Sequence, residues 1–525
     1  MREFEVCDDP NAGLHDRIKL TMCRIGTCLP FLFALSCNPT YAMPCEKLTA
    51  LVIPATAITS AVTVTAGPFS PGGSGGRGGA PPRSFPAFCR VTAIATPVPD
   101  SEIHLELWLP ESSVWNGKLL GTGNGGYSDA IGYTDMERGL RQGYAVAGSD
   151  TGHQGGDLKF GVGHPEKIND WAWRAVHVMT ETAKLVARSY YGRFAAHAYF
   201  SGCSTGGQQA LTEAQRYAGD YDGILAGDPG NNRVRLNIGF LWSWQAAHAD
   251  PSAPLPVSKL ALINKAAIAA CDAADGVKDG IIGDPVSCKF DPAALQCNGA
   301  DGADCLTKSQ VAAVRAIYDG AKNPRTGEQL YSGWVRGSEA GWSSYFVGQQ
   351  EPARLDFWRY WVFHDPNWDF RSFDFDRDAA YADSQMEFLT ANDPDLNRFS
   401  GRGGRLLIYQ GWADPVVPPE DTIRYYESVR LSMGAERASS TARLFLVPGM
   451  GHCSGGPGPS TFDGLSALDA WVTQGTAPSK ILATHTTNGS GDRSRPLCPY
   501  PQLARWKGTG STDDASNFEC VAPRR

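Results

Sequence analysis

The sequence predicts an α/β fold built on a mainly parallel sheet. Short apolar runs bounded by glycine recur along the first half of the chain: His104 to Leu109, Lys118 to Gly121, Tyr144 to Gly148, Ala198 to Ser201 and Gly223 to Gly227. Helical patterns such as Trp171 to Tyr190 lie between them, and strands that alternate with helices indicate a parallel sheet. Sheet-like runs return only at Arg405 to Gln410 and Arg443 to Val447, so a long insertion interrupts the predicted sheet.

The length of the chain supports that division. At 525 residues it exceeds the size at which a single hydrophobic core stops growing. The alternation of strands and helices fades after about residue 230, where a region rich in tryptophan, aspartate and short turns begins. The predicted organisation is, in order, a leader at residues 1–42, a first part of the core at 43–230, an insertion at 231–395 and a second part of the core at 396–525.

The composition is that of an acidic globular protein. Hydrophobic residues make up 42% of the chain, charged residues make up 19%, and the net charge is −8. Proteins that bind nucleic acid usually carry a basic face, so this charge argues against that class. Fourteen cysteines are many for a cytosolic enzyme and indicate an oxidising compartment.

The N-terminal residues resemble a secretory signal. Basic residues between Arg17 and Arg24 precede an apolar stretch, Leu29 to Leu35, and a short polar spacer leads to Tyr41-Ala42. The apolar stretch is too short to span a membrane as a helix. We therefore expect a secreted or periplasmic protein without a membrane span. Lipid attachment at Cys37 is the alternative, although the residues before it form a poor lipobox.

Ten cysteines remain once the leader is removed, an even number that fits five disulfides. Sequence alone does not determine their connectivity, and free buried thiols are the alternative. Nearest-neighbour pairing suggests Cys45–Cys89, Cys271–Cys288, Cys297–Cys305 and Cys498–Cys520, and leaves Cys203–Cys453 as the one long-range bond. If that last bond forms, its Cα atoms lie about 4.4–6.8 Å apart. It would then hold the neighbouring Ser204 and His452 within roughly hydrogen-bonding reach, as a nucleophile and its general base require.

Ser204 is the candidate nucleophile because it lies in the pattern Gly-x-Ser-x-Gly, at residues 202–206. In a nucleophile elbow this pattern forms a sharp turn from strand to helix, whose glycines relieve crowding and expose the serine hydroxyl. The flanking sequence fits, since Ala198 to Phe200 reads as a strand and Gln208 to Tyr217 as an amphipathic helix. The pattern alone is weak in a glycine-rich chain, and its context strengthens it.

Asp414 and His452 are the candidate acid and base. Each follows a predicted strand, and the order Ser, Asp, His is that of nucleophile-elbow hydrolases. Both therefore emerge where an open α/β sheet keeps its ligand site. Taken singly, Asp414 reads as a turn residue before Pro415 and His452 as a loop residue. Together with the two cysteines they predict a triad, in which His452 accepts the proton of Ser204 and Asp414 orients the imidazole.

A developing oxyanion would need two backbone donors. The amide of Thr205, directly after the nucleophile, is the first candidate. The glycine-rich run at residues 121–126 supplies the second, with Gly126 preferred and Gly125 as the alternative. The run could also be only a tight turn, and its glycine spacing does not match a dinucleotide fingerprint. The residues thus predict a secreted serine esterase.

These motifs resemble those of the tannase and feruloyl esterase family, which also includes the mono(hydroxyethyl) terephthalate hydrolases. The match is close at residues 202–207, 221–224, 411–415 and 451–453, and the resemblance covers nearly all of the chain after the leader. It implies an α/β-hydrolase core, an inserted lid and a disulfide between Cys203 and Cys453. The terephthalate enzyme has glutamate after its serine, whereas Thr205 looks more like the tannase and feruloyl esterase side.

An acidic loop at residues 271–281 is a candidate metal site. It carries three carboxylates within eight residues, broken by glycines, and such a loop can wrap a hard cation; a solvated acidic turn is the alternative. An EF-hand is excluded because the required acid is missing at its last position. The family resemblance implies a structural Ca²⁺ here and no organic cofactor. The implied ligands are Asp272, Asp275 and Asp279 with the carbonyls of Val277 and Ile281.

The insertion is also rich in aromatic residues from Trp334 to Phe370. Most such residues pack a core, but one or two could wall the pocket for a planar phenolic acid. Arg336, Arg354 and Arg359 could bind a carboxylate, although surface ion pairs are the usual role of such residues. We expect hydrolysis of small aromatic esters such as hydroxycinnamates or gallates. The alternatives are a terephthalate monoester hydrolase and, from another class, a non-catalytic calcium-dependent binding protein.

Overall fold

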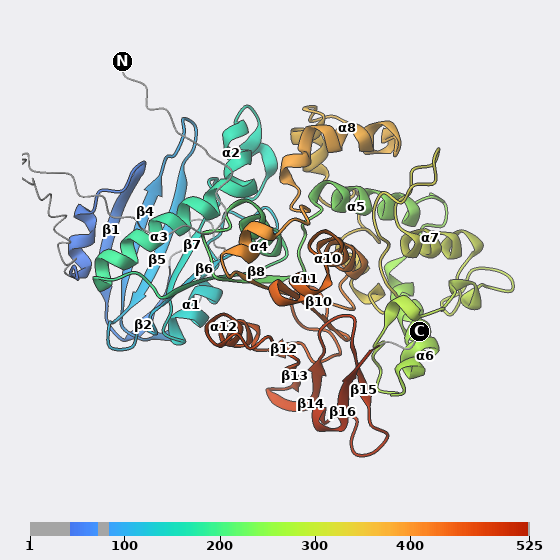
Figure 1. The fold of residues 1–525 in the computed structure, drawn as a ribbon. Coiled ribbons are helices and arrows are strands. Elements are labelled where there is room, and N and C mark those ends of the chain that lie inside the picture. Colours follow the sequence, from blue (N-terminus) through green and yellow to red (C-terminus); the bar gives the residue numbers. More distant parts are fainter. Residues whose placement is uncertain (1–41, 72–82, 523–525) are drawn as a thin grey trace, which may run out of the picture. The chain divides into compact units, whose positions relative to one another are not determined.

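A nine-stranded sheet runs through the residues that this computed structural model describes, 42–71 and 83–522 (Figure 1). The strand order is β1-β4-β5-β7-β6-β8-β9-β10-β11. The strands are β1 (Thr56–Val64), β4 (Phe88–Ala95), β5 (Ile103–Pro110), β6 (Lys118–Thr122), β7 (Ala145–Ser149), β8 (His197–Cys203), β9 (Gly223–Gly227), β10 (Arg405–Gly411) and β11 (Ala442–Val447). The expected α/β class is confirmed.

The sheet is mixed, not parallel throughout. From β7 to β11 every neighbouring pair is parallel, whereas β1, β4, β5 and β7 pair antiparallel. The short connection between β4 and β5 requires that pair to be antiparallel, because a parallel pair needs a crossover of a dozen or more residues. The parallel strands are short and largely apolar. In β9 all five residues are buried, as expected for a strand covered on both faces.

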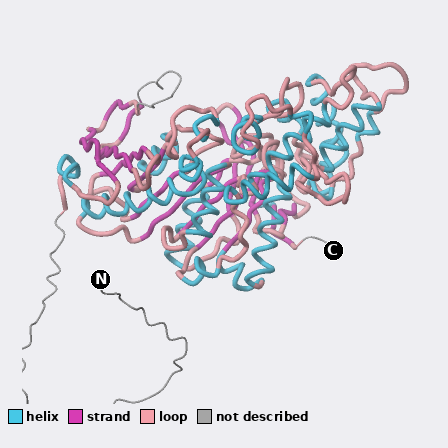
Figure 2. The backbone as a smooth tube through the Cα atoms, turned by 90° about the horizontal axis from the view of Figure 1, so that it is seen from above, coloured by secondary structure: helices cyan, strands magenta, loops and turns pink. Residues whose placement is uncertain are grey.

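Helices cover both faces of the sheet (Figures 1 and 2). One face packs against α3, α4, α10 and α11 in one hydrophobic cluster, and the other packs against α1 and α12. The helices of the core are α1 (Tyr133–Arg141), α2 (Pro165–Asn169), α3 (Ala175–Tyr191), α4 (Thr205–Arg216), α9 (Asn397–Gly401), α10 (Pro419–Met433), α11 (Ala435–Thr441) and α12 (Gly464–Gln474). Helix α3 ends where Gly192 takes a left-handed φ of 71°, a common C-terminal cap.

The residues between β9 and β10 contribute helices and, within this described stretch, no strand of the large sheet. The helices are α5 (Arg233–Ala247), α6 (Leu260–Cys271), α7 (Lys308–Asp319) and α8 (Arg377–Met386). Helix α7 begins with a capping box in which Thr307 and Gln310 satisfy each other's backbone amides. A separate hydrophobic cluster fills this region and also takes in Trp171 from the core and Val416 beside Asp414.

Two small sheets follow the last strand of the large sheet, and neither was predicted from the sequence. One contains β12 (Thr461–Phe462), β13 (Ile481–Thr487) and β14 (Ser490–Leu497), and the other pairs β15 (Leu503–Trp506) with β16 (Phe518–Val521). A further short pair near the N-terminus joins β2 (Gly67–Phe69) to β3 (Arg83–Phe85).

All ten cysteines of the described residues form disulfides. The pairs are Cys45–Cys89, Cys203–Cys453, Cys271–Cys288, Cys297–Cys305 and Cys498–Cys520, the five that nearest-neighbour pairing suggests. No helix in the described part of the chain is both long and apolar enough to cross a membrane. The secretory leader expected at residues 1–42 lies, apart from its last residue, outside the described residues.

Candidate active site

Ser204 lies at the turn between β8 and α4 with φ 64° and ψ −117°. Residues other than glycine rarely adopt this backbone region, and a nucleophile elbow requires it to expose the serine side chain. The backbone of Ser204 is held from two sides, because its amide donates to the Gly227 carbonyl at 2.9 Å and its carbonyl accepts from the Gly230 amide at 3.1 Å. The predicted elbow is therefore present as a strand-to-helix turn.

The glycines of the elbow are required by close backbone contacts. A Cβ on Gly202 would lie 2.6 Å from the Gly206 carbonyl carbon, and one on Gly207 would lie 2.3 Å from the Gly227 carbonyl oxygen. Real Cβ atoms do not approach backbone this closely. These contacts let α4 start directly against β8 and β9, so that its free N-terminal amides point toward the site of the nucleophile.

Asp414 and His452 form a hydrogen-bonded pair at the carboxyl ends of β10 and β11. His452 Nδ1 lies 2.8 Å from Asp414 Oδ2. The other carboxylate oxygen of Asp414 accepts from the amides of Val416 and Val417, at 2.7 and 3.0 Å. Asp414 is fully buried, whereas the His452 side chain keeps 19% of its surface exposed. This arrangement holds the imidazole by Nδ1 and leaves Nε2 available to a nucleophile.

The Cys203–Cys453 disulfide joins the two halves of the predicted triad. Its Cα atoms are 5.9 Å apart although 250 residues separate them in the chain. The loop of His452 also touches the end of β10 directly, because a Cβ on Gly411 would lie 2.3 Å from the Gly451 carbonyl oxygen. Among the described residues the Ser204 hydroxyl has no hydrogen-bond partner, so its bond to His452 remains a prediction.

The glycine-rich turn after β6 packs against the elbow. A Cβ on Gly123 would lie 2.7 Å from Gly206 Cα, which places the turn in contact with the start of α4. The amide of Asn124 donates to Gln209 Oε1 at 3.0 Å and is therefore occupied. Gly125 and Gly126, the second with φ 58°, follow it in the same turn. The turn thus lies where a second oxyanion donor is needed; the choice between these two glycines stays a prediction.

Asp228, directly after β9, is a site residue that was not predicted from the sequence. Its side chain is fully buried, and oxygen atoms of Asp228 and Asp414 lie within 4.8 Å of each other and of a ring nitrogen of His452. Burial, and then the charge of Asp414, raise the pKa of Asp228 well above its ordinary value. One signal was available: Asp228 precedes a proline just past a parallel strand, the same placement that identified Asp414.

Aromatic and cationic side chains lie beside the oxyanion turn. The Arg354 guanidinium lies 5.5 Å from the ring centre of Tyr127 and 5.4 Å from that of Phe240. Its Nη1 is buried without a hydrogen-bond partner among the described residues. Arg233 is also buried, and it donates to the Thr205 hydroxyl at 2.9 Å. Burial lowers the pKa of Arg233 to about 10.

The other two candidate arginines, Arg336 and Arg359, already contact other side chains of the protein. Arg359 pairs with Glu351 at 3.2 Å, and the Arg336 guanidinium lies over the Tyr318 ring. Most of the aromatic residues of this region are core: Trp334, Trp342, Phe346, Phe357, Trp358 and Trp361 are buried. Tyr345 is only partly buried and stacks on Phe240, with ring centres 5.2 Å apart.

In the acidic loop after α6, two of the three carboxylates accept hydrogen bonds from backbone amides of the same loop. Asp272 accepts from the amides of Asp279 and Gly280, both at 3.0 Å, and Asp275 accepts from the Val277 amide at 2.9 Å. Burial, and then the charges of Asp279 and Asp272, raise the pKa of Asp275 to about 6. Three carboxyl groups therefore crowd into one loop.

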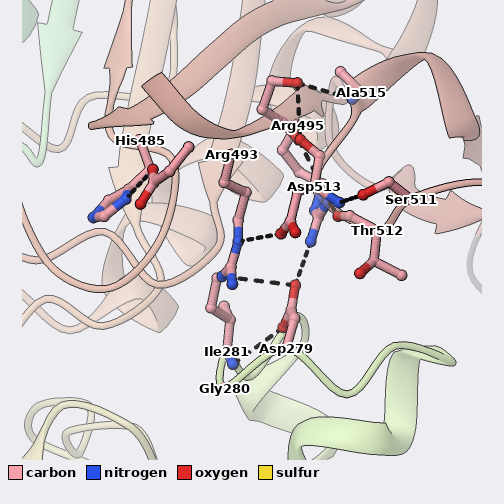
Figure 3. Close-up of polar contacts among 12 residues, drawn as sticks. Asp279, Gly280, Ile281, His485, Arg493, Arg495, Ser511, Thr512, Asp513 and Ala515 are labelled. Carbon is pink, nitrogen blue, oxygen red and sulfur yellow. Dashed lines mark hydrogen bonds and ion pairs between the residues drawn. The ribbon is translucent and has the colours of Figure 1, made fainter. Parts of the chain in front are cut away.

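Asp279 points from this loop toward β14 (Figure 3). Its Oδ2 contacts the guanidinium of Arg495 and lies 3.9 Å from Arg493 Nη1. A cavity of about 40 Å³ is lined by Asp275, Asp279 and Arg495 among others. In the described structure the oxygens of Asp272, Asp275 and Asp279 do not all lie within 4.8 Å of one another. The donor set nevertheless fits a hard cation, because crowded buried carboxylates beside a small cavity are the oxygen ligands Ca²⁺ prefers.

Comparison with known proteins agrees with this geometry. A model of the tannase and feruloyl esterase family matches residues 89–521. The chain is 38% identical to an uncharacterized esterase of Xanthomonas campestris over 94% of this chain and 93% of that protein. It is 34% identical to a mono(2-hydroxyethyl) terephthalate hydrolase of Piscinibacter sakaiensis, over 84% of this chain and 86% of the relative.

The structural comparison extends over the whole fold. The crystal structure of feruloyl esterase B from Aspergillus oryzae superposes with a TM-score of 0.85 at 31% identity, covering 91% of this chain and 99% of that one. This likeness and the mixed central sheet flanked by helices identify the α/β-hydrolase fold. This chain belongs to the tannase and feruloyl esterase family and is a carboxylic ester hydrolase.

Proposed function

We propose that this hydrolase cleaves esters of aromatic, phenolic acids through an acyl-enzyme on Ser204. The observation that carries the proposal is the 2.8 Å pair between His452 Nδ1 and buried Asp414, tied to the Ser204 elbow by the Cys203–Cys453 disulfide. Membership of a family of ester hydrolases sets aside a non-catalytic calcium-dependent binding protein. Aromatic walls at Tyr127, Phe240 and Tyr345 support a planar acyl group.

The chemistry follows from the positions of the groups. Ser204 Oγ attacks the ester carbonyl while His452 Nε2 takes its proton, and Asp414 stabilises the imidazolium that forms. The amides of Thr205 and Gly126 would donate to the oxyanion. As the intermediate collapses, the carbon–oxygen bond to the alcohol breaks and His452 returns the proton to that alcohol. A water molecule, activated by the same imidazole, then hydrolyses the acyl-enzyme.

An ester panel tests both parts of the proposal. Turnover of methyl ferulate, methyl gallate and mono(2-hydroxyethyl) terephthalate should be compared with that of a simple aryl acetate. Ser204→Ala should abolish hydrolysis of every ester while the unfolding temperature stays at the parental value. Cleavage of the acetate alone would contradict the aromatic-acid specificity. Parental activity in Ser204→Ala would contradict the acyl-enzyme.

A terephthalate monoester is the second candidate substrate, and Arg354 favours it. This guanidinium lies between two aromatic rings, and its buried Nη1 has no hydrogen-bond partner within residues 42–71 and 83–522. A carboxylate on the far side of an aromatic acyl group would supply that partner. Arg354→Gln should then raise KM for the monoester and leave KM for methyl ferulate unchanged. Arg359→Gln, which removes a cation already paired with Glu351, is the matched control.

We also propose that the acidic loop binds a structural Ca²⁺ through Asp272, Asp275 and Asp279, with the carbonyls of Val277 and Ile281. The crowding that raises the pKa of Asp275 supports the proposal, because a cation would relieve it. Added Ca²⁺ should raise the unfolding temperature of the chelator-treated protein and have no such effect on Asp275→Asn. Equal stabilisation of both proteins would contradict this site.

Secretion is proposed from the leader and the disulfides. Five disulfides in the described residues suit an oxidising compartment. The protein expressed in its own host should be found outside the cytoplasm, with its N-terminus cut near residue 42. Recovery from the cytoplasm with residues 1–42 intact would contradict the proposal, and a lipid on Cys37 would favour the alternative.

A further inference from the structure

Asp228 is a buried acid at the centre of the site that the proposed mechanism does not use. It follows β9 with φ 37°, a backbone conformation that residues other than glycine rarely adopt. Its side chain is fully buried. A strained, buried acid of this kind persists only where the surrounding contacts determine its conformation.

The carboxyl group of Asp228 joins three separate segments. Its Oδ1 accepts from the Gly411 amide at 2.8 Å, at the end of β10. Its Oδ2 accepts from the Cys453 amide at 3.2 Å, in the loop that carries His452. The same oxygen lies 3.5 Å from Cys203 Sγ, at the end of β8. One side chain therefore touches the strand end before the catalytic acid and both halves of the disulfide.

Gln410 connects Asp228 to the catalytic acid. Its Nε2 donates to Asp228 Oδ1 at 2.9 Å and to Asp414 Oδ2 at 3.1 Å. The amide is oriented by Thr422, whose hydroxyl donates to Gln410 Oε1 at 2.7 Å. The Asp414 oxygen that receives this bond is the one that holds His452 Nδ1. A shift of Asp228 would therefore reach the imidazole through Gln410 and through the Cys453 amide.

We propose that Asp228 is a positioning residue for the Asp414–His452 pair, which it holds by joining the ends of β9 and β10 to the His452 loop. The proposal rests on the proposed triad. Asp228 does not touch the reacting atoms, so its effect on hydrolysis is indirect. It acts by fixing where the imidazole lies relative to Ser204.

In its neutral, protonated form, Asp228 holds the Asp414–His452 pair. The titratable groups that face it are Asp414, His452 and Tyr409, and the two cysteines beside it are joined in a disulfide. Asp414 and Asp228 are both fully buried and close together, so that two negative charges there would repel strongly. A proton kept on Asp228 removes that repulsion, in line with the raised pKa of this carboxyl group. Asp414 then keeps the negative charge that the imidazolium needs.

Two variants of Asp228 test the proposal. Asp228→Ala should lower kcat by about 10- to 100-fold, as a displaced catalytic group does, with KM for methyl ferulate little changed. The rate at which a fluorophosphonate inactivates Ser204 should fall in parallel. Asp228→Asn, the neutral isostere, should keep most of the parental kcat. Because the asparagine replaces a neutral group, the acid limb of its kcat/KM profile should stay at the parental pH.

The controls separate positioning from general stability. Glu213→Gln removes another buried carboxyl with a raised pKa, on α4 and away from the pair, and should leave kcat unchanged. Parental kcat in Asp228→Ala would overturn the proposal. An acid limb shifted to lower pH in Asp228→Asn would also overturn it, because the limb moves in that direction when a nearby negative charge is lost. If Asp228→Ala does not fold, Asp228→Asn decides alone.

The outcomes also distinguish this inference from the proposed function. Loss of hydrolysis in Ser204→Ala together with parental kcat in Asp228→Ala would remove only the role of Asp228. Hydrolysis that survives Ser204→Ala would remove the triad itself, whatever the variants of Asp228 do.

Discussion

Three residues beside the catalytic pair adopt a left-handed backbone that side chains rarely tolerate: Ser204 at φ 64°, Asp228 at 37° and Cys453 at 65°. Each such residue costs on the order of 1–3 kcal/mol and persists only when its surroundings determine it. Here the surroundings are a disulfide, the elbow glycines and the carboxyl group of Asp228. Strain is thus concentrated where the proposed nucleophile, acid and base meet.

The elbow glycines give the first prediction at this scale. Gly202→Ala places a Cβ 2.6 Å from the backbone of Gly206, which no side-chain rotation relieves. The variant should lose about 1–3 kcal/mol of stability, as overpacking does, together with most of its activity. Urea unfolding and ester turnover would measure both. Gly299→Ala, where a Cβ meets nothing within 4 Å, is the control and should match the parent.

A second prediction concerns Asp421, near the start of α10. Burial raises its pKa from 3.8 to about 6, and its Oδ2 has no hydrogen-bond partner among the described residues. Between pH 4 and 6 the folded protein therefore keeps a proton that the unfolded chain releases, so its contribution to stability falls as the pH rises. Asp421→Asn has no ionisable group at this position, so the stability of the variant does not fall with pH in this way. Its stability relative to the parent should rise by up to about 3 kcal/mol over that window and level off above it.

Urea unfolding of both proteins at several pH values between 4 and 8 measures that difference. A difference that does not change with pH would mean that Asp421 ionises alike in the folded and unfolded chains.

At the scale of elements, the proposed triad and the positioning residue Asp228 all come from the carboxyl ends of neighbouring parallel strands. Ser204 follows β8, Asp228 follows β9, Asp414 follows β10 and His452 lies in the loop after β11. Parallel pairing places these ends along one edge of the sheet, about 5 Å from strand to strand. The Cys203–Cys453 disulfide spans this edge from β8 to the loop after β11.

Removing that disulfide is the prediction at this scale. The double variant Cys203→Ala/Cys453→Ala should lose about 2–5 kcal/mol of stability, and its kcat should fall because the loop of His452 is released from the elbow. The control is Cys297→Ala/Cys305→Ala, which removes a disulfide between two cysteines only 8 residues apart in the insertion and should leave kcat unchanged. Equal kcat in the parent and the first variant would make Cys203–Cys453 a purely structural bond.

At the scale of the whole molecule, residues from the end of the chain hold the acidic loop of the insertion. Arg495, on β14, is buried and contacts the Asp279 carboxylate (Figure 3). Its guanidinium also lies 3.9 Å from the centre of the Phe518 ring. Trp334 of the insertion donates from Nε1 to the Pro415 carbonyl at 2.8 Å, directly after the catalytic acid. The insertion is therefore anchored both to the small C-terminal sheets and to the active-site edge.

Arg495→Met tests the first anchor. Removing Arg495 leaves the buried Asp279 carboxylate with only the longer 3.9 Å contact to Arg493, and stability should fall by about 3–5 kcal/mol. Because Arg495 lies away from Ser204, kcat should remain parental at temperatures where the variant is folded. Arg505→Met breaks an exposed pair with Glu519 in the same region and should change stability little. Similar unfolding temperatures for the two variants would show that Arg495 is no anchor.

Much of this could be predicted because it is local. The Gly-x-Ser-x-Gly elbow depends on contacts within a few residues, and the positions of Asp414 and His452 follow from strands whose apolar runs are visible in the sequence. The cysteine pairs followed from proximity along the chain, with the long-range bond left by elimination. Strands β1 and β4 were not predicted. The run that forms β5 was predicted among the strands of a mainly parallel sheet, but an apolar run carries no information about strand direction, so its antiparallel pairing with β4 and β7 was not foreseen.

The amino-acid order by itself determined the α/β class, the chemistry of the three side chains of the proposed triad and the spacing of the acidic loop. Only the tertiary structure brought Asp228 beside Asp414, placed Arg354 between Tyr127 and Phe240, and turned Asp279 toward Arg495. The physical reason is that ionisation and pairing depend on burial and on charges a few ångströms away. Those neighbours come from segments far apart in the chain, so a local sequence pattern does not reveal them.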